Sequence, residues 1–148
     1  TQWVSNVTDA TDHYVFGRLA QTTVSFTTRL SYTLKPTLSL QLYAEPFVSA
    51  GDYGAFKELV DGRAPLYTDR YAPFVYGSNP DFNYRSFRTT NVLRGEYKPG
   101  STLFAVWQQA REGSVEDGAF RFRRDFHDMF SAVGRNVFLV KVAYWLNY

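Results

Sequence analysis

The feature that most constrains this chain is an alternation of apolar and polar residues that recurs in five segments. Between residues 24 and 34 the even-numbered positions are mostly apolar and the odd-numbered positions are polar. The same alternation runs through residues 38–48, 84–98, 102–111 and 137–148. A period of two places successive side chains on opposite faces of a strand, so each segment predicts a β-strand with one apolar face. A sixth strand is expected over residues 14–22.

The connections between these segments alternate between short and long. The short ones carry Lys-Pro at 35–36 and Lys-Pro-Gly at 98–100, where proline fixes φ and Gly100 supplies the positive φ of a type II turn. The long ones, residues 51–83 and 112–136, are rich in Gly, Pro, Asp and Arg. This order predicts an all-β, antiparallel up-and-down meander of five or six strands. Both tight turns are expected at one end and both long loops at the other.

The second long connection is expected to contain one short helix. Asp125 is the expected N-cap, and Gly134 stands where a helix stop is expected. Between them, three apolar residues have helical spacing: Phe126, Met129 and Phe130. We expect this helix to pack over a strand edge or a loop.

Composition narrows the classes of protein that this chain can represent. Aromatic residues make up 18% of the sequence, and there is no run of about 18 apolar residues that would form a transmembrane helix. The absence of cysteine removes disulfides and thiolate sites. A net charge of +2 from 16 basic and 14 acidic residues lacks the basic footprint of a nucleic-acid-binding protein.

One-sided strands of about ten residues, short turns at one end, long loops at the other and many aromatics are typical of outer-membrane β-barrels. In hydrocarbon every backbone polar group needs a partner, so the sheet must close, with one face in lipid and one in the lumen. The expected lumen residues are Arg29, Glu45, Arg88, Arg94 and Glu96, with the acidic members paired to the arginines. Aromatic residues near strand ends suit the interfacial girdles: Tyr32, Tyr97, Trp107, Tyr144 and Trp145. A soluble β-sandwich also alternates and uses hairpins, and it stays an alternative.

The last eight residues, KVAYWLNY, resemble the C-terminal signal by which the bacterial outer-membrane assembly machinery recognises its barrel substrates. Lys141, Ala143 and Tyr148 match this barrel-signal terminus. The sequence departs from the usual signal at two positions, since glycine is usual at Ala143 and an aromatic residue is usual at Leu146.

A wider resemblance rests on three blocks, YVFGRLAQTTVSFTTRLSYTLKPTLSLQLYAEPFVSAGDYGAFKEL, NVLRGEYKPGSTLFAVWQQ and RNVFLVKVAYWLNY. They resemble the C-terminal end of a large uncharacterised bacterial family. Its members typically join an N-terminal carbohydrate-binding-like module, of the family-nine type, to a predicted outer-membrane barrel. The resemblance implies a barrel region for this chain, which lacks both the module and most of the barrel strands.

Five or six strands cannot close a barrel, for which about eight are needed. We therefore expect residues 1–148 to form a single barrel-type domain that is either the C-terminal part of a larger barrel or one subunit of a multichain β assembly. The first case implies a non-enzymatic passive pore or surface scaffold in the bacterial outer membrane, with the lipid bilayer as partner. The second implies a secreted structural subunit that multimerises with neighbouring chains into an extracellular or cell-surface assembly.

No catalytic, metal or cofactor site is predicted. His127 lies between Asp125 and Asp128, a pattern that we interpret as a solvated helix face, and the other histidine, His13, is far away in sequence. The segment 62–85 is the best candidate recognition loop, because its aromatic residues can stack on sugar rings: Tyr67, Tyr71, Phe74, Tyr76 and Phe82. Carbohydrate is thus a candidate partner. The alternative is that these rings pack the loop down onto the barrel rim.

Overall fold

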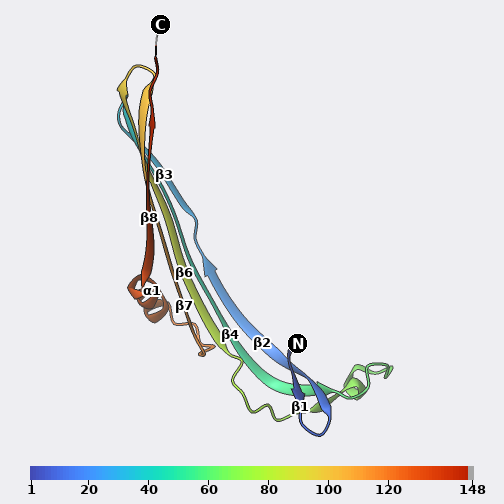
Figure 1. Cartoon of the computed structure of the whole chain (residues 1–148). Coiled ribbons are helices and arrows are strands. Elements are labelled where there is room, and N and C mark those ends of the chain that lie inside the picture. Colours follow the sequence, from blue (N-terminus) through green and yellow to red (C-terminus); the bar gives the residue numbers. More distant parts are fainter. Residues whose placement is uncertain (147–148) are drawn as a thin grey trace. The chain divides into compact units, whose positions relative to one another are not determined.

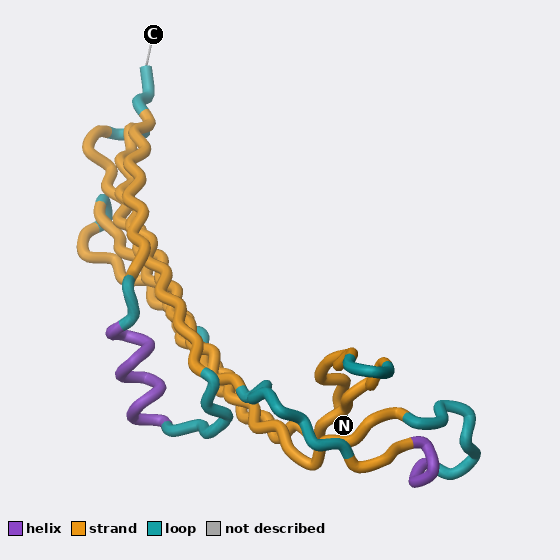
Figure 2. Tube along the Cα trace, turned by 60° about the horizontal axis from the view of Figure 1, so that its bottom comes forward, coloured by secondary structure: helices purple, strands orange, loops and turns teal. Residues whose placement is uncertain are grey.

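A computed structural model describes residues 1–146 as a mostly β structure with one short helix (Figure 1). Figure 2 shows how strands dominate the trace, with α1 as the longer of two helical segments. The strands are β1 (Gln2–Thr8), β2 (Asp12–Ser25), β3 (Thr28–Lys35), β4 (Leu38–Leu59), β5 (Tyr71–Pro73), β6 (Phe82–Lys98), β7 (Ser101–Val115) and β8 (Gly134–Ala143). The helical segments are a 3-10 turn, η1 (Tyr67–Arg70), and the α-helix α1 (Phe122–Ser131).

The strands belong to one antiparallel sheet in the order β1-β2-β4-β6-β7-β8, with β3 and β5 each paired to β4. Strand β3 follows β2 after a two-residue break, where the Phe26 N–H donates to the Pro46 carbonyl at 3.1 Å. The predicted up-and-down meander is confirmed. Segments 14–22, 38–48, 84–98 and 102–111 fall within strands, whereas segment 24–34 spans the two-residue break between β2 and β3. Because the described strands form one sheet, the β-sandwich alternative is wrong for residues 1–146. The sequence pattern missed β1 and the three-residue β5.

Two predicted boundaries are wrong. The last strand, expected over residues 137–148, is β8, which begins at Gly134 and ends at Ala143. The helix begins one turn before the expected N-cap, since Arg121 is the N-cap residue and Asp125 lies inside α1. The physical reason is that the Asp125 carboxylate reaches back to accept the Arg121 N–H at 2.7 Å, so it caps the helix from within the first turn. Gly134 starts β8, and Ala132 is the C-cap.

The chain forms two compact units. Unit 1 consists of Thr1–Thr23, Ser49–Asn83 and Ser114–Phe120. Unit 2 consists of Val24–Val48, Tyr84–Gly113 and the described residues from Arg121 onward. Both tight turns and α1 belong to unit 2, whereas the long connection between β4 and β6 belongs to unit 1.

The buried hydrophobic core of the described residues is small, and it contains only one side chain larger than valine. Its members are Val15, Val48, Ala50, Ala64 and Met129. Many large apolar side chains are instead exposed, among them Phe138 at 72% and Val140 at 71%. A water-soluble domain of this size normally buries such residues, so their exposure calls for a partner surface.

The β6–β7 turn depends on Gly100, whose φ of 74° confirms the predicted left-handed position. Its N–H donates to Glu96 Oε1 at 3.1 Å, and a Cβ at this position would lie 3.1 Å from Trp145 Cβ. We expect Gly100→Ala to lower the free energy of unfolding by about 1–2 kcal/mol, because an L-residue is strained in this region. Urea titration measures the change. Gly113→Ala is the control, since a Cβ there meets nothing within 4 Å, and an equal loss in both variants would contradict the argument.

Candidate functional site

The candidate site is the pair of opposite sheet faces in unit 2. Alternate side chains of neighbouring strands gather on one face, where Leu40 of β4, Leu93 of β6, Trp107 of β7 and Val140 of β8 line one shallow depression. We call this side the apolar face. It also carries the following exposed side chains: Leu30, Tyr32, Leu34, Tyr97, Leu103, Phe138 and Val142. A contiguous face of this kind on a single sheet layer marks a contact with lipid or with another protein.

Aromatic residues stand near both ends of the apolar face. At the end away from the tight turns stands Phe87 of β6, and nearer the middle Trp107 stacks on Phe138, with ring centroids 6.1 Å apart and an interplanar angle of 4°. At the end with the tight turns, the Tyr97 hydroxyl donates to the Ala143 carbonyl at 3.3 Å. On β6 the interval from Phe87 to Tyr97 is ten residues, or about 33 Å along the strand. A tilt of about 40° reduces this to about 25 Å, the height of the apolar band of outer-membrane barrels.

Two polar side chains lie on the apolar face of β6, and both are hydrogen-bonded within unit 2. Thr89 Oγ1 donates to the Tyr43 carbonyl at 2.8 Å. Asn91 Nδ2 donates to Thr89 Oγ1 at 3.3 Å and to the Trp107 carbonyl at 3.4 Å. Polar groups that face hydrocarbon need such internal partners, so these two residues are compatible with a lipid-facing surface.

The opposite side of unit 2, which we call the polar face, carries the five predicted lumen residues. Arg29 lies opposite Tyr43 in the β3–β4 register, with its guanidinium 5.5 Å from the ring centroid. The Tyr43 hydroxyl donates to Glu45 Oε2 at 2.9 Å, and Arg88 Nη2 pairs with Glu112 Oε1 at 3.2 Å. Glu45 therefore has a tyrosine hydroxyl as its hydrogen-bond donor, and its charge also attracts Arg88, more weakly than the charge of Glu112 does.

The remaining two predicted lumen residues lie nearer the tight turns. Glu96 accepts the Gly100 N–H, and the Glu96 backbone N–H donates to the Thr37 carbonyl at 2.7 Å. Glu96 thus holds the tight turn, and within residues 1–146 it forms no ion pair with an arginine. Arg94 has an exposed side chain. The polar face therefore carries charges of both signs and keeps an exposed cation near its turn end.

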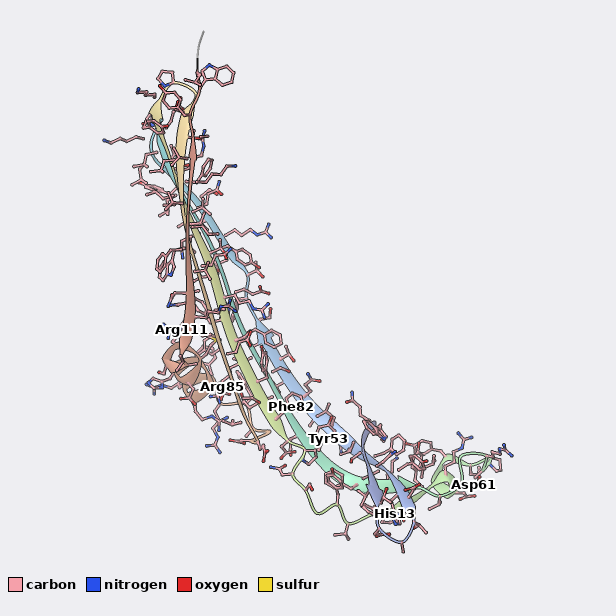
Figure 3. The ribbon with its side chains drawn as sticks, viewed as in Figure 1. His13, Tyr53, Asp61, Phe82, Arg85 and Arg111 are labelled. Atoms are coloured by element: carbon pink, nitrogen blue, oxygen red, sulfur yellow. The ribbon has the colours of Figure 1, made fainter. Side chains whose placement is uncertain are left out.

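Helix α1 is held on unit 2 by polar contacts that the sequence pattern did not indicate. Arg85 of β6 is 4% exposed, and its Nη1 donates to Asp128 Oδ2 at 2.6 Å. Arg111 of β7 donates through Nη1 to the Phe130 carbonyl and, at 3.1 Å, to the Ala132 carbonyl, so it caps the C-terminal end of the helix. Figure 3 labels both arginines, which lie beside α1. The predicted solvated helix face is thus partly wrong.

The carboxylates of α1 have specific partners. Asp125 is fully buried and accepts from Arg124 Nε at 2.8 Å as well as from the Arg121 N–H. Hydrogen bonding from His127, followed by the Arg85 guanidinium, holds the pKa of Asp128 below its usual value. Asp125 therefore stabilises the first turn of α1, and Asp128 attaches the helix to Arg85 of β6.

The predicted recognition loop divides into two groups of aromatic residues in unit 1. Tyr67 and Tyr71 have ring centroids 5.2 Å apart, and Lys57 Nζ lies over both rings, 4.6 Å and 4.0 Å from their centroids. Lys57 also donates to the Tyr67 hydroxyl at 2.7 Å, and this hydrogen bond lowers the pKa of Tyr67. Tyr67 remains 57% exposed, whereas Tyr71 also packs against Phe16 of β2 with ring centroids 5.5 Å apart, so Tyr67 is the accessible ring of this group.

The other three loop aromatics pack against strand residues of unit 1. Phe74 lies 5.2 Å from the ring of His13, and Tyr76 lies 5.2 Å from the ring of Phe56. Phe82 lies 6.5 Å from the ring of Tyr53, and it fills the space beside Gly51. Figure 3 labels Phe82 and Tyr53. These three rings pack the loop against aromatic residues of the strands, as in the alternative interpretation of the sequence.

His13 connects the β1–β2 hairpin to β4. Its Nδ1 pairs with Glu58, its Nε2 lies 3.3 Å from Asp9 Oδ1, and Thr11 Oγ1 lies 3.1 Å from the same nitrogen. The hydrogen bond that the imidazole donates to the Glu58 carboxylate is the main cause that raises the pKa of His13 above its usual value. Backbone N–H groups of Thr11 and Ala10 lower the pKa of Asp9.

We expect the hairpin to become more mobile as the pH rises through the folded-state pKa of His13. Since that pKa is raised, the stabilisation is complete below the unfolded value of about 6.5 and is lost at higher pH. Amide exchange of residues 8–12, corrected for its intrinsic pH dependence, measures this. His13→Gln is the control and is expected to remove the pH effect; a wild-type profile that matches this variant at every pH would refute the proposed link.

The barrel-signal residues lie in and after β8. Lys141 pairs with Phe104 in the β7–β8 register, and its Nζ lies 6.0 Å from that ring centroid. Ala143 pairs with Thr102 and accepts the Tyr97 hydroxyl. Tyr148 lies outside the described residues. The role of all three residues as an assembly signal stays a prediction.

Within residues 1–146 no cluster of three or more His, Cys, Asp or Glu side chains has the arrangement of a metal site. The only α-helix of this part of the chain, α1, is too short and too polar to cross a bilayer as a helix.

The comparisons with known proteins give a family and no described function. No curated protein and no solved structure matches the chain at a significant level. One family model, described as a domain of unknown function, DUF5916, matches residues 1–148. The match covers the whole sequence, and the chain therefore belongs to the DUF5916 family.

Proposed function

We propose that this chain is a non-enzymatic segment of a bacterial outer-membrane β-barrel, with the strand residues of unit 2 crossing the membrane. The observation that carries the proposal is the exposed apolar face on a single sheet layer, with large side chains such as Phe138, Val140 and Val142 at 61–72% exposure. Lipid tails are the partner that suits an apolar band of about 25 Å bounded by aromatic residues. The polar face then lines a lumen.

The polar face supports a passive role within this proposal. Several of its charged groups are held in local contacts, such as the 3.2 Å pair between Arg88 and Glu112. A lumen that carries both signs of charge suits a water-filled pore or a surface scaffold. The resemblance of the sequence to the barrel region of a bacterial family with a carbohydrate-binding-like module adds support. In that setting the exposed ring of Tyr67 is the candidate contact for carbohydrate.

The sheet edges decide how the barrel closes in this proposal. Within unit 2 the outer strands are β3, which pairs with β4, and β8, which pairs with β7, and among the described residues neither has a strand on its other side. An open edge leaves backbone groups unpaired, which lipid does not tolerate. Further strands, from the same polypeptide or from neighbouring chains, must therefore pair with these edges.

The experiment uses the absence of cysteine, which allows single-cysteine labelling. Cysteines at positions 137–142 of β8 are labelled with an environment-sensitive fluorophore, and the protein is reconstituted into vesicles that contain brominated lipids. We expect quenching at Phe138, Val140 and Val142 and little at Val137, Leu139 and Lys141, because the two sets lie on opposite faces. Absence of this two-residue period would contradict the proposal.

Extraction and sizing separate the proposal from its runner-up, a secreted structural subunit. A protein that requires detergent supports the membrane barrel. A protein that elutes from water as a large multimer supports the secreted assembly, in which the apolar face contacts neighbouring chains.

A further inference from the structure

Helix α1 turns a row of phenylalanines away from its polar anchors. Phe122, Phe126 and Phe130 are spaced by four residues, so successive members are offset by about 40° around the helix. Phe122 is 58% exposed and Phe130 is 50% exposed, and the rings of Phe122 and Phe126 lie 4.5 Å apart. We call these three residues the phenylalanine stripe.

The orientation of the stripe is fixed by side chains beside it and opposite it, since Met129 lies about 20° from Phe122 around the helix and Asp128 lies about 160° from Phe126. Met129 is 2% exposed, Asp125 is fully buried, and Asp128 is bound by Arg85 of β6. Arg111 holds the C-terminal carbonyls of the helix. A helix anchored at its first turn, its middle and its end cannot roll to bury the stripe without breaking these contacts.

Polar side chains, among them the cations of Arg121 and Arg123, flank the stripe. Arg123 and His127 occupy the positions that follow Phe122 and Phe126, so they lie on the adjacent arc of the helix, and both are exposed. Arg121, the N-cap residue, is also exposed. The two acidic residues of α1 are engaged by Arg85 and Arg124. The outward surface of the helix therefore combines aromatic rings with a basic border.

The geometry points to a binding surface for anionic, phosphate-bearing lipid headgroups, with α1 lying in the membrane interface. This inference rests on the proposed membrane location and extends it to a segment outside the strands. Amphipathic helices with phenylalanines on one side and basic residues on the other bury their apolar side about 5–10 Å into the boundary between headgroups and acyl chains. Basic side chains at that boundary attract anionic lipid.

Continuity with the apolar face selects lipid as the occupant. Phe130 contacts Phe87 of β6 with ring centroids 5.0 Å apart. The stripe therefore extends the apolar face at the end of its aromatic band that lies away from the tight turns. If Val140 and Leu93 lie at the middle of the bilayer, its headgroup region lies at the level of Phe87. The exposed Arg121 and Arg123 of α1 can contact lipid phosphate there.

The test places a single labelled cysteine at position 126, on the stripe, or at Ser131, about 140° around the helix from Phe126. The protein is reconstituted in vesicles of phosphatidylcholine and phosphatidylglycerol, brominated either near the headgroup or near the chain end. We expect the label at 126 to be quenched most by shallow bromine and to shift to the blue. The label at Ser131 is expected to show neither effect. Phe122→Cys serves as a second stripe label if Phe126→Cys disturbs the helix.

A label at Val140 separates failure of this inference from failure of the proposed function. Quenching at Val140 without quenching at 122 or 126 would overturn the interfacial helix and leave the barrel intact. Absence of quenching at Val140 would overturn the barrel and the inference that rests on it.

The charge requirement has its own variant, Arg121→Gln/Arg123→Gln. In vesicles with phosphatidylglycerol we expect it to reduce the shallow quenching at position 126, and in pure phosphatidylcholine we expect little change. The Val140 label should be unaffected in both. Equal quenching in the variant and the parent in anionic vesicles would overturn the assignment of anionic phosphate as the ligand.

Discussion

Replacement of Val140 by arginine is expected to lower the free energy of unfolding in lipid vesicles by about 2–4 kcal/mol, the cost of a cation near the bilayer midplane on the lipid face of a barrel. Val140 pairs with Ala105 of β7 and lies on the apolar face beside Leu93 of β6, between the levels of Phe87 and Tyr97. An arginine side chain at this depth cannot reach the headgroup region on either side without deforming the bilayer, so its charge carries a free-energy cost.

The neighbouring residue provides the matched control. Leu139 is 54% exposed against 71% for Val140, and it pairs with Val106 on the polar face. We expect Leu139→Arg to change the free energy of unfolding by less than about 1 kcal/mol, because a lumen accepts a hydrated charge. Urea titration of both variants in the same vesicles gives the comparison.

The outcome also discriminates between the two functions. If the apolar face is exposed to water in the functional protein, arginine at either position should change the free energy of unfolding little, because both side chains are already exposed. If only Leu139→Arg destabilises, the assignment of the faces is reversed. The membrane proposal requires a large cost at Val140 together with a small cost at Leu139.

The strands and their faces were predictable because a period of two is a local signal. In the segment that forms β3, the alternation alone places Leu30 and Tyr32 on the side opposite Arg29. Strand β5 has only three residues and exists through its pairing with Lys57–Leu59 of β4, so no local pattern reveals it. The helix was predictable from the spacing of Phe126, Met129 and Phe130.

The contacts that define the candidate site were less accessible to sequence reasoning. Arg85 and Asp128 are 43 residues apart and meet only because β6 and α1 are brought together. Lys57 meets Tyr67 and Tyr71 through the turn of η1, and nothing in the spacing of these residues indicates a cation between two rings. The sequence did identify the aromatic loop, but which rings stay exposed depends on partners such as His13 and Phe56.

The second large effect is expected at the anchor of α1, where Asp128→Ala should be more damaging than Arg85→Met. Asp128→Ala leaves the guanidinium of Arg85, 4% exposed, without its counterion. The Nε atom of Arg85 is already buried with no hydrogen-bond partner among the described residues. Loss of Asp128 therefore leaves the guanidinium charge uncompensated. We expect the helix to lose about 3 kcal/mol of local stability, seen as roughly a hundred-fold faster amide exchange in α1.

Arg85→Met removes the buried charge itself. The Asp128 side chain is 45% exposed, so its carboxylate stays hydrated when the arginine is gone, and methionine fills much of the same volume. We expect a cost of about 1 kcal/mol, since a buried ion pair exchanged for an apolar side chain is often near neutral. The double variant should then exchange like Arg85→Met and much more slowly than Asp128→Ala. If Asp128→Ala proves the milder of the two single changes, the packing of the arginine stem holds α1 in place and the ion pair does not.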